Sequence, residues 1–260
     1  MCLIIFAYRY HPQYPLILTA NRDEFYERPT SKAHFWDDHP GVLGGRDMKY
    51  GGTWMGLTRS GRFAAVTNFR DRTEFREHPL SRGIMVKDFL TRNDSPETYL
   101  QRIMHRDYEY NGFNLLLGDL TTLVYYSNRS SKMKILKPGV YGLSNHLLDT
   151  PWPKVTNTRQ AFTKIIEQPG TLDVERLSGI LHDQTQARDI ELPDTGFGLE
   201  WERILSSPFI VTPTYGTRAS TLFLLDKNGH AQFTERSFSG PEDPGSTVHH
   251  EFNLTDSEQI

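Results

Sequence analysis

Residue 2 is the only cysteine in this chain of 260 residues, and two roles are open to it. Free cysteines commonly serve as small buried hydrophobic residues, and Cys2 begins the apolar run CLIIFA. Alternatively, removal of Met1 would place a thiol and a free α-amino group on one residue. An α-amine with a pKa of about 7.7–8.0 is substantially neutral near pH 8 and can act as the base for the thiol. The second role is that of a cysteine nucleophile at a processed N-terminus.

The polar tetrapeptide NRDE, at 21–24, is predicted to lie close to Cys2. The segments 2–10 and 15–23 have the pattern of two strands, and the turn-forming residues His11-Pro12 lie between them. A hairpin pairs its two open ends, so its second strand brings 21–24 back beside residue 2. A strand-end ion-pair and turn motif is the alternative interpretation of these four residues.

The rest of the chain alternates between antiparallel strand patterns and groups of amphipathic helices. Because a parallel α/β sheet needs a helix after nearly every strand, this order indicates an α+β fold. The expected elements are a meander within 41–70 turning at Ser60-Gly61, helices at 81–91 and 95–104, strands at 113–120 and 122–128, a hairpin at 132–145 turning at Pro138-Gly139, helices at 153–168 and 172–184, and two strands within 209–238 around Asn228-Gly229.

Several blocks of the sequence together resemble one known family. MCLIIF and LTANRDEFYERPT are similar to the opening of the NRDE family, also called the transport and Golgi organisation 2 family. The blocks GGTWMGLTRSGRFAAVTNFR, SRGIMVKDFL, YNGFNLLLGD, GVYGLSNHLLDTPWPKV and PTYGTRASTLFLLDKNG follow in the family's order. The resemblance therefore runs from Met1 to about Phe238.

The resemblance implies a four-layer αββα sandwich like that of the N-terminal-nucleophile hydrolases, with Cys2 at the start of a central strand. Among those enzymes the family looks closest to the bile-salt and penicillin V amidases, which expose a cysteine by cleavage and attack an amide carbonyl. The implied function is therefore hydrolysis of a small-molecule amide, with Cys2 supplying both thiol and amine.

The family pattern also implies roles for Arg22 and Asp23. Asp23 would hold the α-amine, and Arg22 would add positive potential that favours the thiolate. In the amidases an arginine precedes the aspartate by three positions, whereas the two residues are adjacent here. Adjacent strand residues point to opposite faces, so only one of them is expected to face the site unless the strand bulges or ends there.

Three further residues are implied by the resemblance. Asn68 and Asn145 would offer amide N–H donors to an oxyanion, and Arg218 would line the same pocket from a late strand. Two of them have a plainer alternative, which for Asn145 is a cap or turn after GVYGLS and for Arg218 a structural carboxylate partner.

A binding or carrier protein without turnover is the alternative function. Eukaryotic relatives are linked to Golgi organisation and to handling of haem or lipid, so the resemblance also supports a pocket for a hydrophobic ligand. Cys2 or a histidine could then contact haem iron.

Other chemistries receive little support. The ten histidines include no HExxH or HxH spacing, so we predict no metal and no cofactor. The stretch 59–82 holds six arginines but interleaves Asp71, Glu74 and Glu77, so nucleic acid is not an expected partner. The expected partner is a small-molecule substrate or a hydrophobic ligand.

Length and charge set the expected domain organisation. The net charge is −3, and the last 22 residues carry five acids and no lysine or arginine, which leaves +2 for the body. We predict one domain at 1–238 and an acidic, loosely packed tail at 239–260. No apolar run approaches the length of a membrane span or a signal peptide core, so a cytoplasmic protein is expected.

Overall fold

The computed structural model describes residues 2–72, 76 and 79–255. The chain divides into two compact units. The first combines Met1–Glu27, Arg70–Thr73 and Lys137–Glu251, and the second combines Arg28–Phe69, Glu74–Leu136 and Phe252–Ile260. Each unit is built around one antiparallel sheet.

The sheet of the first unit has the strand order β10-β1-β2-β11-β12-β13. Its strands are β1 (Cys2–Tyr8), β2 (Leu16–Phe25), β10 (Gly139–Leu143), β11 (Tyr215–Leu225), β12 (His230–Ser237) and β13 (Ser246–Asn253). Its helices are α3 (Pro153–Ile166), α4 (Val174–Gly179) and α5 (Leu199–Ile204), with short 3-10 turns η2 (Ile180–His182) and η3 (Asp189–Glu191).

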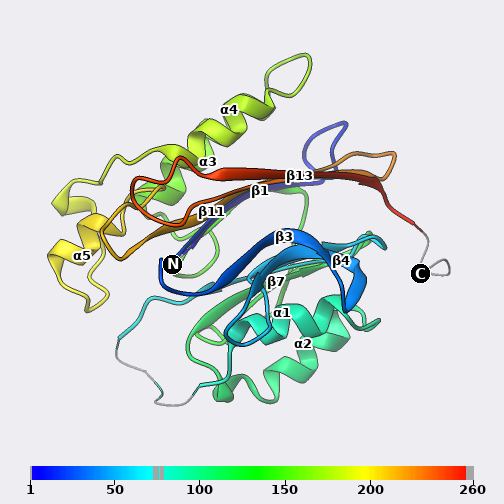
Figure 1. The fold of residues 1–260 in the computed structure, drawn as a ribbon, viewed down its shortest axis with the longest axis horizontal. Coiled ribbons are helices and arrows are strands. Elements are labelled where there is room, and N and C mark those ends of the chain that lie inside the picture. Colours follow the sequence, from blue (N-terminus) through cyan, green and yellow to red (C-terminus); the bar gives the residue numbers. More distant parts are fainter. Residues whose placement is uncertain (1, 73–75, 77–78, 256–260) are drawn as a thin grey trace. The chain divides into compact units, whose positions relative to one another are not determined.

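Helices α3 and α4 cover one face of this sheet (Figure 1). Leu3, Ile5 and Ile17 alternate along β1 and β2 and form one buried cluster with Val155 and Phe162 of α3. Alternation places Cys2 and Arg22 on the opposite face of the same strands. The helix layer therefore packs on the face that Cys2 does not occupy.

The sheet of the second unit has the strand order β3-β4-β5-β6-β7-β8-β9. Its strands are β3 (Thr30–Trp36), β4 (His39–Asp47), β5 (Met55–Thr58), β6 (Phe63–Asn68), β7 (Phe113–Gly118), β8 (Leu123–Ser127) and β9 (Lys134–Ile135). Its helices are α1 (Arg82–Leu90) and α2 (Pro96–Met104), with the 3-10 turn η1 (Asp107–Glu109).

Helices α1 and α2 pack on this second sheet (Figure 1). Their residues Met85, Phe89 and Leu100 share one buried cluster with Val66 of β6 and Leu115 of β7. Helix α2 begins as its sequence predicts, because the Ser95 side chain accepts the Thr98 N–H and Pro96 fills the first position. The predicted α+β class is confirmed, and each unit consists of one sheet and one helical layer.

The described residues form one of two predicted hairpins and not the other. The hairpin of β1 and β2 is confirmed, with Cys2 opposite Arg22. The hairpin predicted at 132–145 is wrong, because β9 pairs with β8 whereas β10 pairs with β1 in the other sheet.

Three strands were not predicted. β3 and β4 pair with each other in the second unit, and β13 lies beside β12 at the edge of the first sheet. β13 falls within 239–260, the segment predicted to pack loosely. One domain over 1–238 stays a prediction. Among the described residues, no helix is long and apolar enough to cross a membrane.

Candidate active site around Cys2

Cys2 is the first residue of β1, and two polar side chains from the end of β10 contact its main chain. The Cys2 N–H donates to Asn145 Oδ1 at 3.4 Å, and the Ser144 hydroxyl donates to the Cys2 carbonyl at 2.8 Å. Ser144 Oγ also lies 3.2 Å from Asn145 Oδ1. Strand β10 is antiparallel to β1, and its last residue, Leu143, pairs with Ile4. The two residues that follow Leu143 therefore lie beside Leu3 and Cys2. The structure thus brings Asn145 to Cys2.

The NRDE segment lies on β2 beside Cys2. Arg22 is the cross-strand partner of Cys2 and shares its face, whereas Asn21 and Asp23 point to the helix-covered face. Asp23 is buried, and its Oδ1 accepts the Thr217 hydroxyl at 2.8 Å. Asn21 donates to the carbonyls of Leu181 and Pro208 at 2.7 and 2.9 Å. The side chains of Arg22 and Asp23 therefore point to opposite faces of the sheet, as their adjacent positions predict.

Lys154, in the first turn of α3, lies near this end of the sheet and was not predicted. The residue is 3% exposed, and its Nζ has no hydrogen-bond partner among the described residues. Burial lowers the pKa of Lys154 to about 8, although the negative charge of Asp23 acts in the opposite direction. A lysine this close to neutrality can switch between a cation and a neutral amine.

A buried ion pair adjoins Lys154. Arg70 Nη1 lies 3.3 Å from Glu202 Oε2, and the two side chains are 1% and 4% exposed. The Arg70 guanidinium stacks on the Trp152 ring at 4.3 Å, and the Arg70 N–H donates to the Asn145 carbonyl at 2.7 Å. The main chain of Arg70, not its ion pair, thus holds the segment that carries Asn145, and sequence reasoning identified neither contact.

The electrostatics at Cys2 work in both directions. Cys2 is partly exposed, but burial raises the pKa of its thiol, and the charge of Asp23 raises it further. The charge of Arg22 and the backbone N–H of Asp23 lower that pKa. Burial also raises the pKa of Asp23, against the charges of Lys154 and Arg22 and the Thr217 hydrogen bond. The protonation states of this site are therefore coupled to one another.

The remaining two predicted residues are placed differently. Asn68 ends β6 in the second unit, where it pairs with Phe113 of β7. Arg218 sits where the β2–β11 register shifts, and it donates to the carbonyls of Phe238, Phe25 and Tyr26 at 2.8, 2.9 and 3.0 Å. Its guanidinium thus binds main chain, and its charge neighbours that of Arg22. Their catalytic roles stay predictions.

The described residues also include no set of side chains suited to a metal ion. Over the described part of the chain, no group of three or more histidine, cysteine, aspartate or glutamate side chains is arranged to hold a metal ion. The donors gathered around Cys2 are instead amides, hydroxyls and charged nitrogen groups, which suit proton transfer and anion stabilisation.

Replacing Lys154 by methionine should make the free energy of unfolding depend less steeply on pH between pH 8 and pH 10.5. In this window the unfolded lysine, with its ordinary pKa of 10.5, binds more protons than the buried one, so its contribution to stability rises with pH. Methionine has similar length and does not titrate.

Urea unfolding of both proteins at several pH values between 7.5 and 10 measures this difference. The free energy of unfolding of the wild type relative to the variant should rise across the series, while Lys164→Met, on the exposed face of the same helix, should show no such trend. A pH-independent difference for Lys154→Met would contradict a buried, depressed lysine.

Comparison with solved structures finds weak likenesses. A Caenorhabditis elegans N-acylethanolamine-hydrolyzing acid amidase ortholog aligns over 86% of this chain and 92% of its own, with 9% identity and a TM-score of 0.47. A C2A mutant of conjugated bile acid hydrolase from Clostridium perfringens covers 99% of this chain and 98% of its own, with 13% identity and a TM-score of 0.43.

The sequence comparisons find much stronger similarities. The Transport and Golgi organization protein 2 homolog of Bos taurus is 39% identical, over 98% of this chain and 99% of its own. Transport and Golgi organization protein 2 of Drosophila melanogaster is 30% identical, over 100% of this chain and 98% of its own. The family model for Transport and Golgi organisation 2 matches residues 1–240. The resemblance noted from the sequence blocks is confirmed, and the chain belongs to the Transport and Golgi organisation 2 family.

Proposed function

We propose that the chain is a cysteine N-terminal-nucleophile hydrolase that cleaves the amide bond of a small molecule after Met1 has been removed. The observation that carries the proposal is the set of contacts at Cys2. Its nitrogen is bound to Asn145 Oδ1, its thiol shares a face with Arg22, and the buried carboxyl of Asp23 lies on the adjoining residue. Nucleophile, base and charged supports thus occupy one end of the first sheet.

The reaction uses the two functional groups of Cys2. The α-amine takes the thiol proton, and the sulfur attacks the amide carbonyl carbon. The C–N bond then breaks, the leaving amine takes the proton from the Cys2 ammonium, and a thioester remains on sulfur. Water attacks the thioester while the α-amine accepts its proton. The acid leaves, and the proton returns to the sulfur.

Asn145 supports both ends of this reaction. Its Oδ1 accepts a hydrogen bond from the Cys2 N–H, which orients the Cys2 nitrogen and leaves Nδ2 as the atom of the amide that carries hydrogens. Amide hydrogens are suitable donors to a developing oxyanion. Ser144 holds the Cys2 carbonyl and so fixes the strand end on which the sulfur is mounted.

One of the surrounding charges supports the thiolate. Arg22, Lys154 and Arg70 carry positive charge, and Asp23, Glu202 and Glu24, which pairs with Arg22 at 3.6 Å, carry negative charge, so the fully ionised cluster has no net charge. The positive charge of Arg22, the cross-strand partner of Cys2, favours the thiolate and offsets part of the burial that raises the pKa of Cys2.

The test is covalent trapping on the full-length protein. Intact mass first selects the preparation that begins at Cys2. That protein is then mixed with a panel of N-acyl amides of increasing acyl length, quenched in acid, and weighed. We expect one acyl addition, mapped to residue 2, together with release of the amine.

Two variants sharpen the test. Cys2→Ala should show neither the adduct nor amine release, because the sulfur is absent. Arg9→Gln, an exposed residue just beyond β1, should behave as wild type. If protein that begins at Cys2 forms no adduct and releases no amine with any member of the panel, the hydrolase proposal is wrong and the carrier alternative is favoured.

A further inference from the structure

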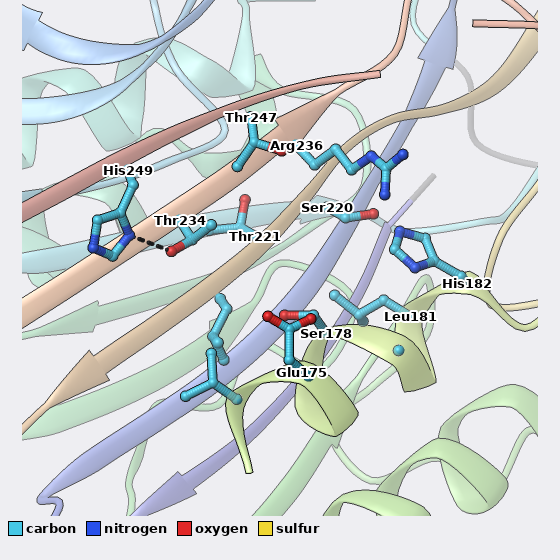
Figure 2. A pocket seen from close by; sticks show the side chains of 13 residues that line it. Glu175, Ser178, Leu181, His182, Ser220, Thr221, Thr234, Arg236, Thr247 and His249 are labelled. Carbon is cyan, nitrogen blue, oxygen red and sulfur yellow. Dashed lines mark hydrogen bonds between the residues drawn. The ribbon is translucent and has the colours of Figure 1, made fainter. Parts of the chain in front are cut away.

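A pocket lies in the first unit, on the helix-covered face of its sheet. It has a volume of about 540 Å³ and is bounded by α4 and η2 on one side and by β11, β12 and β13 on the other (Figure 2). Pockets of about 300–1,000 Å³ hold drug-sized molecules. Its floor includes Ser220, whose hydroxyl donates to Asn21 at 2.6 Å. Asn21 and Arg22 are adjacent in β2, so their side chains point to opposite faces of the sheet. The side chains of Cys2 and Arg22 therefore lie on the face opposite to the pocket.

One end of this pocket carries a fixed cation. Arg236 donates from Nε and Nη2 to the Pro244 carbonyl, the first at 3.0 Å, and its guanidinium lies 5.6 Å from the centre of the Phe238 ring. These contacts hold the guanidinium and leave Nη1 without a hydrogen-bond partner among the described residues. A guanidinium that is already oriented loses little freedom when it binds an anion.

His182 adds a second group at the same end. Its ring packs edge-on against Phe209 and Phe238, at 5.4 and 6.2 Å between ring centres. Its Nε2 is buried and has no hydrogen-bond partner within the described residues. Figure 2 shows Arg236 and His182 at one end with Ser220 between them. Burial, and then the charge of Arg236, lower the pKa of His182.

The rest of the pocket differs in character. Leu181 and Leu222 supply a buried apolar wall, and Glu175 lines the pocket from α4. The Glu175 carboxylate is exposed, and Figure 2 shows it beside Ser178, on the helix side of the pocket. An acid at that place disfavours a second negative charge nearby, so only the end with Arg236 suits an anion.

We propose that this pocket binds a small organic anion whose carboxylate or phosphate oxygens contact Arg236 and His182 and whose apolar part lies along Leu181 and Leu222. In the tautomer that carries its hydrogen on Nε2, His182 donates from a nitrogen that has no partner among the described residues, and beside an oriented guanidinium this is the pattern of a site for an acceptor ligand. The site does not depend on the proposed hydrolase activity, because neither Cys2 nor Asn145 is among the residues that line it.

The test is calorimetric titration of the full-length protein with octanoate, octyl phosphate and 1-octanol. Octanoate or octyl phosphate should bind at one site, and the tighter of the two identifies the preferred oxyanion. Arg236→Gln should weaken that binding by about tenfold, because a charge-assisted hydrogen bond is lost. Octanol should bind at least about tenfold more weakly than the anions for the same reason. Equal binding of octanol and the anions would overturn the proposal.

Three more variants locate the site. Glu175→Gln removes an exposed carboxylate and should tighten anion binding severalfold, whereas a weaker or unchanged affinity counts against the proposed pocket. Arg188→Gln changes an arginine that is 78% exposed and pairs with Glu191, and it should leave binding unchanged. Cys2→Ala should also bind octanoate as wild type does, and loss of binding there would place the ligand at Cys2 instead.

Discussion

Glu202→Gln should destabilise the protein by about 3–5 kcal/mol, the cost typical of breaking a buried ion pair by removing one partner. Arg70 loses its counter-charge in this variant while its side chain stays 1% exposed. Arginine cannot shed its proton in a protein, so the positive charge remains buried and uncompensated. The shape of residue 202 hardly changes, which separates the loss of charge from any loss of packing.

Chemical denaturation measures this prediction directly. Glu191→Gln is the matched control, because its carboxylate pairs with Arg188 at 2.9 Å but both side chains are exposed. Such a surface pair contributes about 0–1 kcal/mol, so the control should change little. Similar losses for the two variants would contradict a special role for the buried pair.

A double variant shows whether the loss of stability comes from the unpaired charge of Arg70 or from changing residue 202 itself. Arg70→Met combined with Glu202→Leu removes both charges and replaces them with apolar side chains of similar volume. Such replacements of buried ion pairs are often neutral or stabilising, so the double variant should be more stable than Glu202→Gln. Because Arg70 also holds the Asn145 carbonyl through its own N–H, that main-chain bond should survive in every variant.

The fold was predictable wherever neighbouring segments pair with each other. The hairpin of 2–10 and 15–23 followed from two alternating runs and a short turn, and the structure forms it as β1 and β2. The hairpin at 132–145 failed because alternation shows that a segment is a strand but not which strand it joins. Lys134-Ile135 and Gly139–Leu143 look like neighbours in sequence, yet their partners belong to two different sheets.

The candidate site was predictable in part. Cys2 and the NRDE segment were brought together by a local hairpin, so their proximity could be expected from period and turn residues. Asp23 and Thr217 are 194 residues apart, and no local pattern links them. Lys154 did leave a signal, because a lysine in the first turn of α3 opposes the helix dipole and α3 has no acid there. The structure shows that the charge of this lysine interacts with the buried carboxyl of Asp23.

Lys154→Met and Asp23→Asn should change the reactivity of Cys2 in opposite directions. Removing the lysine takes a positive charge from the surroundings of the thiol, so the pKa of Cys2 rises and alkylation by iodoacetamide slows, by up to about tenfold near pH 7.5. Removing the carboxylate takes away a negative charge, so the pKa of Cys2 falls and alkylation becomes faster.

The opposite signs make this experiment decisive. Cys2 is the only cysteine in the chain, so the rate of mass addition reports on this one sulfur without a background from other thiols. Looser packing after either substitution would expose the sulfur and accelerate both variants, whereas an electrostatic effect slows one and accelerates the other. Lys164→Met, which removes an exposed lysine from the same helix, should leave the rate unchanged. Acceleration in Lys154→Met would show that the lysine acts through packing, and the positive potential assigned to it at Cys2 would be wrong.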